Sequence, residues 1–134
     1  MKFKKALLIN ISESALDKKY WQKLDTLIEK KVFLPKDSPK IKKELPDTNC
    51  ILTGFQIDVG KKEIDAAPHL KFVGVLATAY GKVDVDYAKK KSIVVSNVPG
   101  YATQSVAELV FAVILEKIRD IAKAKGRGSK GNYS

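Results

Sequence analysis

The chain has 134 residues, of which 45% are hydrophobic and 30% are charged, so it is long enough for one domain with a buried core. Its single cysteine, Cys50, excludes a disulfide or a cysteine-based metal site within one chain, and we expect a reducing, cytoplasmic setting and no metal. The formal net charge is +10, but the lysines are scattered and not interleaved with arginine and aromatic residues, so we expect no specific nucleic-acid partner.

The N-terminal segment predicts a strand followed by a helix. Residues 6–10 form a short apolar run that is typical of a buried parallel strand. The run is too short for a signal segment or a membrane-spanning helix, so we expect no membrane association. Ser12 or Ser14 can cap the helix that follows. Apolar side chains recur there at helical spacing: Leu16, Tyr20, Leu24, Leu27 and Ile28.

The middle of the chain continues this alternation. Residues 32–34 predict a second strand, which Pro35 closes. Further segments predict strands at 50–53, 72–76 and 93–96 and helices at 38–45, 61–66 and 85–91. Because apolar strands alternate with helices, we expect an α/β fold with a parallel sheet covered by helices on both faces. Ligands bind such sheets at the carboxyl ends of the strands, so the loops of interest begin at Gly54, Ala77 and Asn97.

An apolar helix dominates the last part of the chain. Ser105 and Glu108 have the spacing of a capping box, in which two side chains satisfy orphan backbone donors. Residues 106–115 are apolar almost all round, and such a helix must be buried on all sides. We therefore expect a homo-oligomer that forms through residues 105–115. The polar, glycine-rich residues 126–134 are typical of a flexible linker.

The sequence lacks the residues that dinucleotide binding and hydride transfer to a keto acid require. A dinucleotide site requires a G-x-G-x-x-G turn between a strand and a helix, whereas the nearest candidate, residues 126–131, follows a helix. Hydride transfer to a keto acid needs an acid–base group, usually a histidine oriented by a carboxylate, and an arginine to bind the substrate. The sole histidine, His69, lies in a turn before a strand, and Arg119 and Arg127 lie in the last helix or the tail. We therefore predict no catalytic residue in this chain.

Three segments carry a resemblance to a known family: Ala67–Lys71, Ala77–Asp84 and Asn97–Glu108. In this order they resemble the pattern of the D-isomer-specific 2-hydroxyacid dehydrogenases. The resemblance implies a flavodoxin-like substrate domain at 1–101, an interdomain helix at 102–125 and a linker at 126–134. It also implies that the NAD-binding domain and the catalytic arginine, glutamate and histidine lie beyond residue 134.

The resemblance implies a substrate site as well. The backbone amides of Thr78 and Ala79 would bind the substrate carboxylate, because consecutive free amides can bind an anion without a charged side chain. Gly54 and Phe55 would shape the substrate pocket, although Phe55 can equally belong to the core. Tyr101 would face the substrate from the interdomain cleft, or it would cover the edge of the sheet.

The resemblance also implies a role for Val106, and the loop at 77–82 differs from the family pattern at three positions. Val106 would lie close to the nicotinamide end of the cofactor. The loop departs from the family's ATGYDN because Ala79 replaces Gly, Gly81 replaces Asp and Lys82 replaces Asn. If the glycine position needs a positive φ, Ala79 would be strained by about 1 kcal/mol or more.

Two hypotheses about function follow. In the first, the chain is the substrate-binding half of an NAD-dependent D-2-hydroxyacid dehydrogenase, cut short in its gene or in its preparation. It would then be inactive alone and would not bind NAD alone, while the intact enzyme would transfer hydride between NAD(H) and a 2-hydroxy or 2-keto acid. In the second, it is a free-standing α/β module that binds a partner protein or a small carboxylate through the same loops, without redox activity.

Overall fold

The structure, a computed structural model, describes residues 2–128 and residue 131. The chain divides into two compact units, Met1–Pro99 and Gly100–Ser134. Among the described residues, the first unit contains all the strands and four of the α-helices, and the second contains two further helices. Each unit is described by itself below.

A five-stranded parallel sheet forms the centre of the first unit. Its strands are β1 (Phe3–Ile9), β2 (Ile28–Leu34), β3 (Cys50–Thr53), β5 (Phe72–Val75) and β7 (Val94–Ser96). They lie in the order β2-β1-β3-β5-β7, and all four neighbouring pairs are parallel. Counted along the chain this is the order 2-1-3-4-5, which is the flavodoxin-like arrangement. The predicted α/β fold with a parallel sheet is confirmed.

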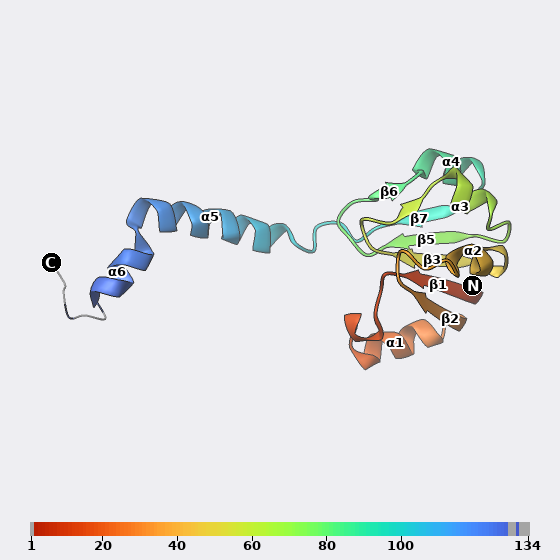
Figure 1. The fold of residues 1–134 in the computed structure, drawn as a ribbon, viewed down its shortest axis with the longest axis horizontal. Helices are drawn as coiled ribbons and strands as arrows, with labels where there is room; N and C mark the ends of the chain where they lie inside the picture. The colour runs from red at the N-terminus through yellow and green to blue at the C-terminus, as the bar shows by residue number, and fades with distance from the viewer. Residues whose placement is uncertain (1, 129–130, 132–134) are drawn as a thin grey trace. The chain divides into compact units, whose positions relative to one another are not determined.

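Helices pack on the two faces of this sheet (Figure 1). On one face lie α2 (Ile41–Glu44), α3 (Lys61–Asp65) and α4 (Val85–Lys90), whose apolar side chains pack with strand residues that include Leu7, Ile51 and Val73. On the other face α1 (Lys18–Asp25) packs Trp21 and Leu24 against residues that include Ala6 and Leu8. Leu7, Leu8 and Ile51 are fully buried, and each such side chain stabilises the fold by about 2 kcal/mol.

The first helix is shorter than the helical spacing predicts. A 3-10 turn, η1 (Glu13–Ala15), comes first, and α1 then begins after Asp17 and not after Ser12 or Ser14. The hydroxyl groups of Ser12 and Ser14 hydrogen-bond each other over 2.8 Å. Ile28, which we placed in this helix, begins β2 and pairs with Phe3. Ile28 therefore pairs within the sheet, where it is buried, although its spacing from Leu24 is that of a helix.

A second, two-stranded sheet was not predicted. It consists of β4 (Asp58–Val59) and β6 (Lys82–Val83), which pair in parallel. Each strand has only two residues, so neither produces a periodic pattern that a sequence analysis can detect. Val59 is fully buried, and the backbone N–H of Asp84 donates to its carbonyl over 3.1 Å. The pair joins the segment after β3 to the segment after β5.

The second unit contains α5 (Thr103–Arg119) and α6 (Ile121–Gly128), separated by Asp120 in the left-handed conformation. The predicted capping box is wrong, because the helix begins after Ala102 and Ser105 lies inside it, while the Glu108 carboxylate accepts from the Gln104 side chain over 2.9 Å. Residues 126–128, where we predicted a linker, belong to α6; residues 129–130 and 132–134 of that prediction lie outside the described residues. Among the described helices, none has the length and apolar character needed to cross a membrane.

Candidate functional site

Three loops leave the carboxyl ends of neighbouring strands. The loop after β3 begins with Gly54 and Phe55, the loop after β5 comprises residues 76–81, and the segment after β7 begins with Asn97. Since β3, β5 and β7 are adjacent and parallel, these loops share one edge of the sheet. This is the edge at which open α/β sheets bind ligands.

Hydrogen bonds connect the loop after β5 to the end of β3 and to the segment after β7. The Leu76 amide donates to the Thr53 carbonyl over 2.8 Å, and the Val98 amide donates to the Ala77 carbonyl over 2.9 Å. The Asn97 side-chain amide donates to the carbonyl of Thr78 over 2.7 Å. The loop after β5 is therefore held from both sides, by the end of β3 and by the segment after β7.

The loops after β5 and β3 approach each other closely at Gly81, which lies against the backbone of Phe55. The φ of Gly81 is +62°, and a Cβ atom at this position would lie 2.2 Å from the carbonyl oxygen of Phe55. A side chain is excluded by the backbone conformation and by the contact at once. Gly81 stands where the resembling family has Asp, so this departure allows the loop after β5 to lie directly against the loop after β3.

Ala79 does not have the positive φ that would strain an alanine where the family has glycine. The non-glycine residues with positive φ in the described part of the chain are Asn10, Ser92 and Asp120. The residue of this loop with positive φ is Gly81, two positions later. The condition under which Ala79 would cost about 1 kcal/mol is therefore not met.

The backbone amides of Thr78 and Ala79 are available for a ligand. Both residues are exposed, and in the described part of the chain neither amide donates a hydrogen bond to another residue. Consecutive unpaired N–H groups favour an anion, and hydrogen bonds to a charged acceptor are stronger than neutral ones. The loop can thus bind a carboxylate without a cationic side chain.

Gly54 and Phe55 border this loop. A Cβ atom at Gly54 would meet no other atom within 4 Å, so open space lies beside it. Phe55 is 46% exposed, so its side chain does not belong to the core. The two residues leave an open, partly apolar surface next to the free amides.

Tyr101 and Val106 belong to the second unit. Tyr101 precedes α5 and is 66% exposed, while Val106 lies in the first turns of that helix and is 58% exposed. The roles predicted for them involve the loops of the first unit, and they stay predictions. The structure groups Gly54, Phe55, Thr78 and Ala79 at one edge of the first unit.

Groups for acid–base or metal chemistry do not gather at this edge. Within the described residues no cluster of three His, Cys, Asp or Glu side chains could hold a metal ion. His69 is exposed and precedes β5, as its predicted place in a turn before a strand implies, so it lies at the opposite, amino-terminal edge of the sheet. Burial raises the pKa of the Cys50 thiol to about 12, so this buried cysteine is not a nucleophile.

The glycines of α6 do not form a dinucleotide-binding turn. Gly126 and Gly128 lie within α6, and α6 follows another helix, so no strand leads into these glycines. Their backbone is helical and does not form the turn that cradles a pyrophosphate.

Sequence reasoning missed two features near the loops. Asn97 and Gly81 position the loop after β5, and only the departure from the family pattern drew attention to Gly81. A cavity of about 340 Å³ lies beside β4 and β6, lined by Gln56, Asp58 and Lys82 over an apolar floor that includes Ile51. None of the predicted site residues lines this cavity, so it is separate from the candidate site.

Comparison with known proteins places the chain among dehydrogenases. The family described as D-isomer specific 2-hydroxyacid dehydrogenase, catalytic domain, matches residues 7–126. A hydroxypyruvate reductase from Blautia hydrogenotrophica is 36% identical over 80 residues, which is 60% of this chain and 24% of that protein. A D-3-phosphoglycerate dehydrogenase from Archaeoglobus fulgidus is 31% identical over 123 residues, which is 92% of this chain and 23% of that protein. The chain therefore spans about a quarter of the length of these relatives.

Solved structures agree with the fold. A D-lactate dehydrogenase from Aquifex aeolicus, solved with NAD and lactic acid, matches 96% of this chain and 38% of its own with a TM-score of 0.69 and 26% identity. A 2-hydroxyacid dehydrogenase from Ketogulonicigenium vulgare matches 99% of this chain and 41% of its own with a TM-score of 0.74 and 20% identity, which supports the fold alone.

Proposed function

The chain belongs to the D-isomer specific 2-hydroxyacid dehydrogenase family through that family's catalytic domain, and from this premise we propose that it is the substrate-binding domain of an NAD-dependent enzyme. In the intact enzyme, hydride would pass between NAD(H) and a 2-hydroxy or 2-keto acid. The observation that carries the proposal is the pair of unpartnered amides, Thr78 and Ala79, at the carboxyl end of β5.

These two amides bind the substrate carboxylate in our proposal. Each hydrogen bond to a charged acceptor contributes about 1.5–3 kcal/mol, so the pair alone supports binding in the millimolar range, which corresponds to about 4 kcal/mol. The contacts of Asn97 and Gly81 hold the loop before substrate arrives. A loop that is already ordered loses less entropy on binding, so more of the hydrogen-bond energy is retained.

Four further residues complete the proposed site. Gly54 and Phe55 shape the pocket for the side chain of the 2-hydroxy acid, and the open space beside Gly54 supports this role. Tyr101 faces the substrate, and Val106 approaches the nicotinamide end of NAD in the intact enzyme. The exposure of both side chains in the second unit is compatible with these contacts.

We propose that residues 1–134 by themselves do not catalyse the reaction and do not bind NAD. The support is that the glycines of α6 do not form a dinucleotide-binding turn, that the first unit contains no arginine, and that its one histidine lies at the opposite edge of the sheet. The domain boundaries in this proposal are 1–101 for the substrate domain, 102–125 for the interdomain helix and 126–134 for the linker. The unpaired, buried Cys50 supports a reducing compartment such as the cytoplasm.

Self-association through residues 105–115 is part of the same proposal. Apolar side chains of α5 are about half exposed or more in the described unit, among them Leu109, Val110, Phe111, Val113, Ile114 and Leu115. Pairing of two such helices would remove this surface from water. Light scattering on a concentration series should detect an oligomer that Phe111→Glu converts to a monomer; a monomer at all concentrations in the parent chain would contradict the proposal.

Carboxylate binding is tested by NMR titration with pyruvate and lactate. We expect amide shifts at Thr78 and Ala79. Ala79→Pro removes one of the two N–H donors and should abolish saturable binding, whereas Thr78→Val keeps both donors and should bind as the parent chain does. Equal binding by the parent chain and Ala79→Pro would refute the amide site.

The redox part is tested by the absorbance of NADH in the presence of a panel of 2-keto acids. We expect no turnover from the 134-residue chain. Turnover would refute the proposal that residues 1–134 are inactive alone. Folded protein that binds no carboxylate, but does bind a partner protein, would favour the free-standing interaction module.

A further inference from the structure

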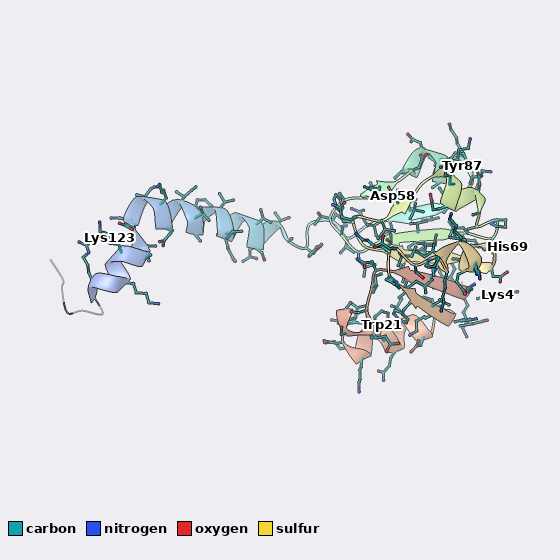
Figure 2. The ribbon with its side chains drawn as sticks, in the orientation of Figure 1. Lys4, Trp21, Asp58, His69, Tyr87 and Lys123 are labelled. Carbon is teal, nitrogen blue, oxygen red and sulfur yellow. The ribbon has the colours of Figure 1, made fainter. Side chains whose placement is uncertain are left out.

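A second cavity lies at the amino-terminal edge of the sheet, opposite the candidate substrate loops. Its volume is about 620 Å³. Figure 2 shows Lys4 and His69 on this side of the first unit, away from Asp58. The cavity is lined by Lys2, Phe3, Lys4, Lys5, Lys30, Asp47, Asn49, His69 and Lys71.

The sheet brings these residues together from four separate segments. Lys5 of β1 is the direct partner of Lys30 in β2. The Asn49 amide donates to the Lys5 carbonyl over 3.0 Å, and the Lys71 amide donates to the Asn49 carbonyl over 2.9 Å. The Asn49 side chain donates to the carbonyl of His69 over 3.2 Å. Backbone hydrogen bonds thus hold the base of the cavity in place.

Most of the positive charge around this cavity has no internal partner. Lys5 is buried, and its ammonium lies 2.7 Å from a carboxylate oxygen of Glu44 and 2.9 Å from the Glu44 carbonyl oxygen. The exposed lysines 2, 4, 30 and 71 make no ion pair within the described chain, and Asp47 is the one carboxylate of the lining. Like charges that surround one space repel each other, and an anion would relieve this repulsion.

The pKa of Glu44, which lies next to Lys5, reflects the same concentration of positive charge. This pKa lies below the ordinary value of 4.5, first because Lys5 hydrogen-bonds to the Glu44 carboxylate and then because the charge of Lys5 favours the carboxylate. Lys30 and Lys40 add to the effect from a distance. The charges around this edge therefore favour an anionic group.

We propose that this cavity binds a small soluble anion that carries two linked phosphate groups. Lysine acts on phosphate as a compact point charge, whereas planar carboxylates are preferred partners of arginine. The only arginines of the chain, Arg119 and Arg127, lie outside this cavity. The volume falls within the range of about 300–1,000 Å³ that small-molecule sites occupy.

This site is independent of the proposed function. β1 has seven residues, and at about 3.3 Å per residue the two edges of the sheet lie roughly 20 Å apart. A phosphate ligand would therefore leave the amides of Thr78 and Ala79 free. Failure of carboxylate binding would not affect this proposal, and failure of phosphate binding would not affect the proposed dehydrogenase role.

Isothermal titration calorimetry of the 134-residue chain with inorganic pyrophosphate tests the proposal. We expect saturable binding that weakens as salt is raised. The double variant Lys30→Gln/Lys71→Gln should bind pyrophosphate at least about tenfold more weakly than the parent chain, because two charge-assisted contacts are lost. The matched control is Lys89→Gln/Lys90→Gln, which removes the same charge from the exposed face of α4 and should bind as the parent chain does.

Several results would overturn the proposal. One is the absence of saturable pyrophosphate binding to the parent chain, and another is an equal loss of affinity in the two double variants, which would indicate net charge alone. A phosphorylated lipid headgroup shares the ligand chemistry, so phosphatidylcholine vesicles with phosphatidic acid form a second arm; vesicle binding without pyrophosphate binding would refute a soluble ligand. Tighter binding of a single-stranded oligonucleotide than of pyrophosphate would indicate a nucleic-acid surface instead.

Discussion

Replacement of Gly81 by alanine should destabilise the first unit strongly. At φ +62° the new Cβ would lie 2.2 Å from the carbonyl oxygen of Phe55. The left-handed conformation costs a residue with a Cβ about 1–2 kcal/mol, and a backbone shift that relieves a core-like clash costs about 1–3 kcal/mol more. We therefore expect Gly81→Ala to lower the free energy of unfolding by about 2–5 kcal/mol.

Gly54→Ala is the matched control on the neighbouring loop. Its φ is not in the positive range, and its Cβ would meet no atom within 4 Å. Alanine also restricts the unfolded chain, so this variant should be unchanged or more stable by up to about 1 kcal/mol.

Urea denaturation measures both variants, with the fluorescence of Trp21 as the signal. Trp21 is the only tryptophan, and it packs edge-on against Phe33 at a centroid distance of 5.6 Å, so it reports on the first unit. For a domain of this size, 1 kcal/mol corresponds to a shift of about 4–8 °C in Tm, which gives a second readout. Stabilities of Gly81→Ala and Gly54→Ala within about 0.5 kcal/mol of each other, the range of ordinary surface changes, would refute the reasoning.

Two further predictions concern titration and reactivity. The pKa of Asp65 lies below its ordinary 3.8, first because the Tyr87 hydroxyl donates to it over 2.7 Å and then because of Lys91; its stabilisation is therefore present above that value and lost as pH falls through the folded pKa. The difference in urea midpoint between the parent chain and Asp65→Asn should shrink below about pH 4; a difference that is the same at pH 3 and pH 7 would contradict this prediction. Cys50 is 2% exposed, with its pKa raised to about 12, so a thiol reagent should label it only at the rate of unfolding; rapid labelling of folded protein would contradict its burial.

The sheet could be predicted because each of its strands contains an apolar run. The runs at 50–53 and 72–76 correspond to β3 and β5 almost residue for residue. β1 and β2 are longer than predicted, since lysines within them conceal the strand pattern: Lys5 is buried against Glu44, and Lys31 lies over the Trp21 ring. A charge that a partner compensates cannot be told from a solvated one in sequence alone.

The candidate site was predictable in its location but not in its construction. Parallel strands bring the loops after Gly54, Ala77 and Asn97 to one edge, and the chain order already implied this. The contact of Gly81 with Phe55 depends on the pairing of β4 and β6, which are too short to leave a pattern. The basic cavity was likewise hidden, because its lysines lie in separate segments that only the strand register places side by side.

The short β4–β6 pair limits how the proposed substrate site can change. Asp58 and Val59 pair with Lys82 and Val83 in a fixed register, so an insertion in either connecting segment would break the pairing and separate the loops. A change in the length of these connecting segments is therefore costly, whereas exchange of single side chains at Gly54 or Phe55 leaves the pairing of β4 with β6 intact. For the proposed substrate site we therefore expect new specificities to arise by substitution at Gly54 or Phe55 and not by a change in loop length.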